Sequence, residues 1–294
     1  MKTILKENKF GVVKTTFNNA MKTKKLLLII PYALLCIVFL AIPLILVLFN
    51  SFIGDVSASW MVVNNFIWQK ILLSIVLALI ATIICIFISY PFSYFIAFSK
   101  YKIWKSVVII LITTPVWSSY LIKIIGLKTF FDLCLGFSNS TYGHIFTVIG
   151  LVYIYTPFMI LPIYNVLNDM PKNLIFASQD LGHNYFSTFV RVIFPFTKNA
   201  FFAGITLVFL PAVTTVAIPQ FLNNNTDSSM IGDIITQEGE QGLISKIALT
   251  RASVVSLIVS IVSLLLYGFI AFIPKIGQLI RKHHPVTKKE EKNV

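Results

Sequence analysis

Charge is scarce in this chain. Of its 294 residues only 12% are charged, whereas 57% are hydrophobic, and the mean hydropathy is +0.85. Soluble domains carry about 25% charged residues, so the composition excludes an ordinary soluble domain. Cysteine is scarce too: Cys36 and Cys85 fall inside apolar runs and Cys134 stands alone between two of them. This arrangement excludes a framework of paired cysteines.

Motifs for chemistry are also missing. The chain has no GxxxxGK[ST] phosphate loop, no GxSxG and no HExxH, and no His, Cys, Asp and Glu residues share the spacing of a metal site. We therefore expect no catalytic residue, no metal and no cofactor in this chain, and the enzyme class is disfavoured. Its apolar runs also lack ionisable residues. Secondary transporters usually place such residues within the membrane, so that class is disfavoured as well.

Long apolar runs are what the chain has in abundance. Crossing a bilayer takes about 20 apolar residues, and the runs predict six transmembrane helices, at Leu26–Phe49, Ile71–Phe98, Ser106–Ile122, Ile145–Leu167, Ala200–Leu222 and Ala252–Pro274. Strands of a membrane β-barrel would be about half as long and would alternate in polarity. The sequence thus predicts an all-α, multi-pass protein of the cell membrane.

The distribution of Lys and Arg predicts the orientation. If the N-terminus is cytoplasmic, 19 of the 24 basic residues lie on the cytoplasmic side, as the positive-inside rule requires. Both termini are then cytoplasmic, in a basic arm (1–25) and a basic tail (275–294). Between them we expect a first helix with its outer loop (26–66) and a membrane core (67–274). Topology and anionic lipid headgroups explain the net charge of +13, and no nucleic-acid partner is expected.

The segment 169–198 between the fourth and fifth runs is amphipathic. Pro171 favours a helix start, Gly182 can end that helix in a left-handed conformation, and Pro195 is expected to end a second short helix that starts at Tyr185. The two helices would present an apolar ridge. Periodicity alone leaves two readings open: a ridge for a groove on a cytoplasmic partner, or a helix lying on lipid headgroups.

Specific residues in this segment favour the first reading. The stretch FASQDLGHNYFSTFVRVIFPFT (Phe176–Thr197) resembles the EAA loop of type I (MetI-like) ABC importer permeases, and YPFSYFIAF, TTPVWSSYLIK, GLVYIYTPFMILPIYNVL, AGITLVFLPAV and MIGDII resemble other parts of that family. Together these stretches cover about 66–274, and the run at 209–222 is most similar to the polyamine (spermidine/putrescine) branch. Relatives that import iron, thiamine or oxyanions remain alternatives.

The resemblance implies that this chain is one of a pair of permease subunits. An extracellular substrate-binding protein would deliver the substrate, and two ATP-binding subunits, which hold the ATP and Mg, would each dock one EAA loop. We call the segment 169–198 the coupling loop. Its family-matching residues, expected to contact or position the ATPase surface, are Ala177, Asp180, Leu181, Gly182, Phe189, Arg191 and Pro195.

The coupling loop departs from the family pattern at three positions. The leading glutamate of the pattern is Phe176 here, its second alanine is Ser178, and the alanine after the glycine is His183. These changes suggest an ATPase surface that differs to match.

A polyamine cation would be met by aromatic faces and hydroxyls. Candidates for the translocation pathway are Tyr94, Trp117, Tyr120, Tyr155, Thr214 and Thr215. Aromatic residues in membrane helices also commonly pack between helices or face lipid, so both readings stay open. The acidic residues Asp227, Asp233, Glu238 and Glu240 are expected in a solvated outer loop; the alternative is that they receive a cation or the binding protein.

Overall fold

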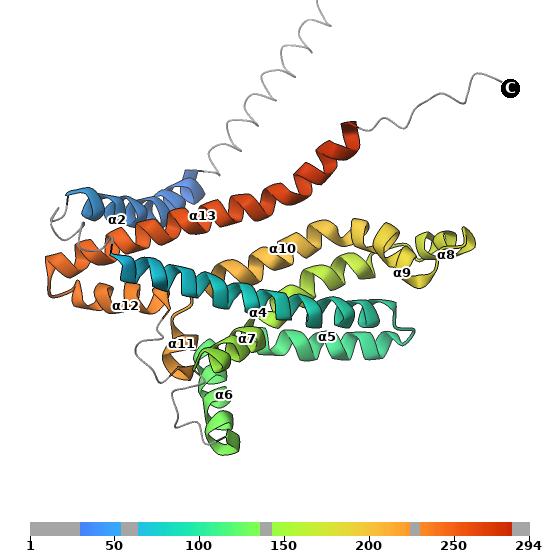
Figure 1. Ribbon diagram of the computed structural model, residues 1–294, viewed down its shortest axis with the longest axis horizontal. Coiled ribbons are helices and arrows are strands. Elements are labelled where there is room, and N and C mark those ends of the chain that lie inside the picture. The colour runs from blue at the N-terminus through green and yellow to red at the C-terminus, as the bar shows by residue number, and fades with distance from the viewer. Residues whose placement is uncertain (1–29, 54–63, 136–142, 224–229, 284–294) are drawn as a thin grey trace, which may run out of the picture.

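The computed structural model describes residues 30–53, 64–135, 143–223 and 230–283, and every regular element within them is a helix (Figure 1). In these ranges, five helices are long and apolar enough to cross a membrane alone, and one bent pair makes a sixth if it counts as one span. The all-helical membrane fold is thereby confirmed. The first span, Ile30–Ile53, contains a π-helical turn, η1 (Ile37–Ala41), and α2 (Ile42–Ile53). The basic arm and the last residues of the tail lie outside the described ranges.

Three long helices form the centre of the bundle: α4 (Asn65–Phe98), α7 (Gly143–Asn168) and α10 (Phe194–Val213). The buried face of α4 consists of small residues that are fully inaccessible, namely Ala78, Ala81, Cys85, Ser89 and Ser93. On α10, a Cβ added to Gly204 would lie 2.9 Å from Sδ of Met159 on α7. Helices in lipid associate through such small residues, because these let the backbones approach closely.

The third predicted span is not one straight helix. Helix α5 (Lys102–Trp117) ends and α6 (Tyr120–Leu135) begins within three residues, with a turn of 100° between them. The carbonyl of Pro115 accepts hydrogen bonds from Ser118 Oγ at 2.9 Å and Lys123 Nζ at 2.8 Å. The backbone N–H of Ser118 bonds to the same carbonyl at 3.3 Å, so three donors gather on it where the helix ends. As a result α6 stands across the bundle (Figure 1).

The coupling loop forms α8 (Asn173–Asp180), α9 (Tyr185–Thr188) and a π-helical turn, η3 (Phe189–Ile193). The prediction that Pro195 ends the second loop helix is wrong, because a single helix of 29 residues continues from Tyr185 to Val213. Pro195 follows the π turn, in which the N–H of Phe194 bonds to the carbonyl of Phe189. The proline thus falls where the regular α-helical bonding is already interrupted.

The fifth predicted span is also interrupted. Helix α10 ends at Val213 and α11 (Ala217–Leu222) follows, so the chain breaks at Thr214–Val216, between Pro211 and Pro219. The predicted solvated outer loop is partly wrong as well: residues 231–241 form α12 (Ile231–Gln241), and Asp233 on it is buried. Asp227 lies outside the described residues. The last helix, α13 (Lys246–His283), packs against α2 and α12 along one edge of the bundle (Figure 1).

Candidate functional site

A tight glycine turn joins the two helices of the coupling loop. Gly182 has φ of +80°, and no other residue in the described ranges has a positive φ. Its N–H bonds to the carbonyl of Gln179 at 2.8 Å, and the N–H of His183 bonds to the carbonyl of Ser178 at 3.2 Å. This pair of bonds is a Schellman motif, which favours glycine at the left-handed position. The structure therefore confirms that Gly182 terminates the first helix.

Polar contacts hold the second helix in place after the turn. The side chain of Asn184 caps α9 by accepting a hydrogen bond from the N–H of Ser187 at 2.8 Å. The buried hydroxyls of Ser178 and Thr188 lie 3.0 Å apart and join α8 to α9. Ser178 stands where the family pattern has alanine, so this departure contributes a contact inside the loop. The two helices thus form one small unit.

The outer surface of this unit is apolar. Leu181 is 79% exposed and Tyr185 82% exposed, and Phe176, in place of the family glutamate, is 57% exposed. Ala177, Asp180 and Gly182 are exposed beside them. This surface is an uncovered apolar ridge with few charges, a form that suits a groove on another protein.

The remaining predicted loop residues face differently. Phe189 packs edge-on against Tyr90 of α4, with 5.3 Å between the ring centroids. It therefore attaches the loop to the bundle and is not part of the exposed ridge. Arg191 is exposed, and its Nη1 lies 3.4 Å from Nε2 of His183 across the turn. Pro195 is half-buried at the start of α10. Periodicity alone cannot distinguish the side of an amphipathic helix that meets its own bundle from the side that meets a partner.

Three of the six predicted pathway residues come together near the break after α10. The hydroxyl of Tyr120, at the start of α6, lies 2.7 Å from Oγ1 of Thr215, within the break. The hydroxyl of Tyr155, on α7, donates to the carbonyl of Pro211 at 3.3 Å. We call Tyr120, Tyr155 and Thr215 the hydroxyl cluster. It joins the bend of α5–α6, the central helix α7 and the end of α10.

The other three pathway candidates lie elsewhere. Tyr94 packs against Phe98 near the C-terminal end of α4, with 4.9 Å between the centroids of the tilted rings. Trp117 is 88% exposed at the α5–α6 bend. Thr214 is exposed, and its hydroxyl donates to the carbonyl of Leu210 one turn earlier. Only Thr214 adjoins the hydroxyl cluster, through its neighbour in the chain.

The N-terminus of α12 closes over the same break, which sequence reasoning did not foresee. A Cβ added to Gly232 would lie 2.6 Å from the carbonyl oxygen of Thr214 and 2.7 Å from that of Thr215. The N–H of Ile231 bonds to Oγ of Ser74 on α4 at 2.9 Å. The glycine of the motif MIGDII, Gly232, could have indicated this contact, because glycine is typical of positions where another backbone approaches closely.

Asp233 lies one residue further along α12 and is 6% exposed. Burial raises the pKa of its carboxyl above the usual range, and the nearby carboxylate of Glu240 adds to this, whereas the ammonium of Lys70 on α4 opposes it. Lys70 of α4 and Asp233 of α12 therefore lie near each other at this end of the bundle, opposite the coupling loop (Figure 1). The chain spacing of 163 positions hides such a pair from sequence inspection.

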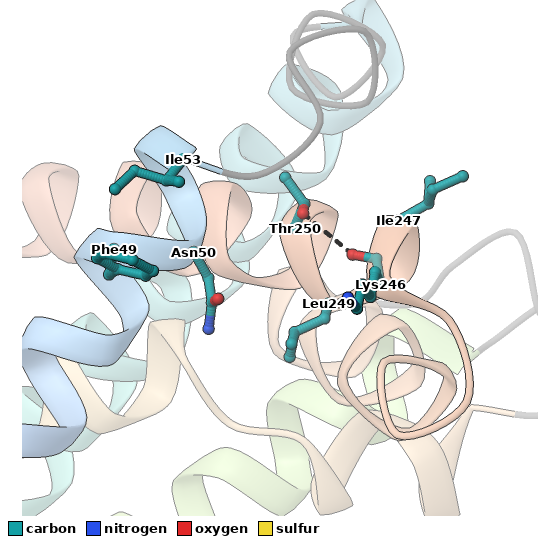
Figure 2. Close-up of a pocket in the computed structure, with 7 residues that line it drawn as sticks. All are labelled: Phe49, Asn50, Ile53, Lys246, Ile247, Leu249 and Thr250. Carbon is teal, nitrogen blue, oxygen red and sulfur yellow. Dashed lines mark hydrogen bonds between the residues drawn. The ribbon is translucent and has the colours of Figure 1, made fainter.

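A pocket of about 420 Å³ opens between α2 and the start of α13. Figure 2 shows its lining residues, among them Asn50 and Lys246, and the hydrogen bond from the Thr250 hydroxyl to the Lys246 carbonyl. No residue of the hydroxyl cluster lines this pocket. It belongs to the peripheral pair of helices and is not the pathway that the sequence predicts.

Comparison with known sequences agrees with this geometry. Residues 89–275 match the family described as binding-protein-dependent transport system inner membrane component. A protein of Mycoplasma genitalium named spermidine/putrescine transport system permease protein PotB homolog is 38% identical over 92% of this chain and 98% of its own length. The protein of that name from Mycoplasma pneumoniae is 44% identical over 66% of this chain and 70% of its own. PotB of Escherichia coli K12 is 31% identical over 68% and 80%.

Solved structures share the fold at low sequence identity. A chain of a bacterial ABC transporter for the acidic polysaccharide alginate matches 87% of this chain and 97% of its own, with a TM-score of 0.62 and 13% identity. A chain of the MetNI methionine ABC transporter, solved in inward-facing conformations, matches 75% and 97%, with a TM-score of 0.52 and 15% identity. The chain belongs to the binding-protein-dependent transport system inner membrane components, the multi-pass permease subunits of ABC transporters.

Proposed function

We propose that this chain is the permease subunit of an ABC importer that carries the polyamines spermidine and putrescine into the cell. The names of the relatives, at 31% to 44% identity, support this substrate class. The exposed apolar ridge of the coupling loop supports the view that another subunit docks there and supplies the energy for transport. A separate ATPase would bind the ATP and Mg, and this chain would bind no cofactor of its own.

The proposed assembly contains a second permease, two ATP-binding subunits and an extracellular substrate-binding protein. Both termini and the coupling loop face the cytoplasm in this assembly, as the basic residues predict. Leu181 anchors in an apolar cleft of the ATPase, Ala177 allows close approach, and Gly182 sets the angle between the two loop helices. Asp180 and Arg191 make polar contacts at the rim of this interface.

The continuous helix from Tyr185 to Val213 is the observation that carries this mechanism. Its 29 residues span about 43 Å at 1.5 Å per residue. One end bears the exposed coupling turn, and the other reaches the break beside the hydroxyl cluster. When the ATPases close and move the turn, the helix transmits that movement to the cluster as a nearly rigid body. The π turn η3 is where it can adjust.

The hydroxyl cluster suits a cationic substrate that must pass without tight binding. Tyr120 and Tyr155 offer aromatic faces, which attract ammonium groups, and Thr215 offers a hydroxyl. The break also interrupts the helical bonding, and irregular backbone at membrane depth is tolerated where it lines a pathway. We infer that polyamines pass this cluster when the bend of α5–α6 and the end of α10 separate.

ATP hydrolysis by the assembled complex in nanodiscs tests the substrate class. The binding protein is loaded in turn with spermidine, putrescine, thiamine, ferric iron or an oxyanion. We expect only the polyamines to stimulate hydrolysis above the unliganded rate. Stimulation by another ligand alone would keep the importer mechanism and replace the substrate. No stimulation by any of these ligands in an assembled complex would contradict the proposal.

A further inference from the structure

A groove of about 190 Å³ lies between the end of α4 and the start of α5. This junction is at the same end of the bundle as the coupling loop (Figure 1). Its walls are mainly apolar, and its lining residues are Phe92, Phe95, Ile96, Ser99, Trp104, Lys105 and Val108. Phe95 is 73% exposed and Trp104 is 61% exposed. Neither the hydroxyl cluster nor the exposed ridge of the coupling loop includes any of these residues.

The chain segments that adjoin this groove are rich in lysine. Lys100, Lys102 and Lys105 fall within six residues, and Lys105 itself lines the groove. Nζ of Lys105 donates to Oδ1 of Asn168, the last residue of α7, at 2.8 Å. The ammonium of Lys172 lies close enough to repel that of Lys105. Asp169 is the one carboxylate in the two adjoining chain segments, 99–108 and 165–175, which together hold four lysines.

We propose that this groove binds one anionic phospholipid. The acyl chain lies along Phe92, Phe95 and Trp104, and the phosphate lies between Lys102 and Lys105. Tryptophan and lysine at one level are typical of the membrane–water interface, where the indole ring and the ammonium reach the headgroups. Anionic lipids are attracted to clustered lysines at this depth.

The dimensions of the groove favour lipid over protein. A stable protein interface buries about 800 Å² on each partner, whereas this groove holds about 190 Å³ and is lined by seven residues. The proposal goes beyond the polyamine function and does not depend on the substrate. Under the proposed orientation, the lipid belongs to the cytoplasmic leaflet, and it adjoins the end of α7 that leads into the coupling loop.

Photocrosslinking of the assembled transporter in liposomes tests this site. Phosphatidylglycerol and phosphatidylcholine, each with a diazirine in the acyl chain, are supplied separately at equal mole fraction, and labelled residues are mapped by mass spectrometry. We expect label on Phe92, Phe95 or Trp104, with phosphatidylglycerol favoured. A lysine near an anionic surface contributes about fivefold in binding. Lys102→Gln and Lys105→Gln should therefore each reduce the preference about fivefold.

Lys128→Gln on α6, away from the groove, is the matched control and should leave the preference unchanged. Both groove variants replace a solvent-accessible side chain and should insert normally, which labelling by phosphatidylcholine at other sites verifies. Equal labelling of the groove by the two lipids would overturn the proposal. Absence of label, which is expected if the second permease covers the groove, would overturn it too, as would a preference that neither variant reduces. If the assembled transporter takes up no polyamine but the groove is still labelled preferentially by phosphatidylglycerol, that result counts against the proposed function alone.

Discussion

Substitution of Gly182 measures how much the left-handed backbone of the coupling turn contributes to its conformation. A Cβ at this position would meet no heavy atom within 4 Å, yet φ is +80°. Gly182→Ala therefore creates no clash, and its cost is that of the left-handed backbone, about 1–2 kcal/mol for a residue with a Cβ. Such a cost lowers the ratio of the native turn to other turn conformers by about 5-fold to 30-fold. The remainder of the bundle keeps its stability.

Two further variants of Gly182 separate the effect of the backbone conformation from the effect of a charge on the docking surface. Asparagine tolerates the left-handed conformation, so Gly182→Asn should retain most transport. Aspartate tolerates it as well, but it places a carboxylate on an exposed turn beside Leu181, which is 79% exposed. If the turn docks in an apolar cleft, Gly182→Asp abolishes uptake even though the chain inserts normally. The Ala variant should lie between these two.

Initial rates of ATP-dependent spermidine uptake into proteoliposomes, normalised to the amount of inserted chain, measure this series. Stimulated ATP hydrolysis is recorded in parallel, because a turn that no longer docks should lose both activities together. Normal uptake by Gly182→Asp would refute the docking of the turn. Equal loss in Asn and Asp variants would refute the separation of backbone and surface effects.

Three further experiments test the end of the bundle opposite the coupling loop. Gly232→Ala should abolish uptake and lower the melting temperature, since its Cβ would meet two backbone oxygens within 2.7 Å. Gly239→Ala on the same helix, with open space around it, should be neutral or stabilising. Equal effects of the two substitutions would contradict the close packing at Gly232. Tyr120→Phe and Thr215→Val should each destabilise by about 1 kcal/mol, and together by less than the sum; full additivity in thermal unfolding would count against their hydrogen bond. Because the folded-state pKa of Asp233 is raised, its ionisation costs stability as pH rises above the unfolded pKa of about 3.9. Asp233→Asn should therefore stabilise the protein more at pH 7 than at pH 4. A stability difference between the variant and the parent chain that does not change with pH would refute this.

Hydropathy predicted the spans well because lipid imposes a simple rule on length and polarity. The bend after Trp117 escaped it, since the apolar run continues through Ser118 and Ser119. The side-chain bonds of Ser118 and Lys123 to the Pro115 carbonyl mark the break, and hydropathy does not register them. Pro195 was misread for a similar reason: a proline usually ends a helix, but a preceding π turn removes the need for its N–H.

The sites were predictable to different degrees. The turn at Gly182 depends on local backbone geometry, so a short motif was sufficient. The hydroxyl cluster joins Tyr120 and Thr215, which are 95 positions apart, and sequence could nominate these residues but could not separate them from Tyr94 or Trp117. The contacts of α12, from Ile231 to Ser74 on α4 and from Gly232 to the break after α10, arise only when distant helices pack, which periodicity does not report.

The most direct test of the central claim is the uptake of labelled spermidine into proteoliposomes that contain this chain, the second permease, the ATPase and the binding protein. The account predicts saturable uptake that disappears when ATP, the ATPase or the binding protein is omitted. Uptake that persists without ATP or the ATPase would contradict a permease driven through its coupling loop. No spermidine or putrescine uptake by a complex that hydrolyses ATP in response to another ligand would contradict the polyamine assignment.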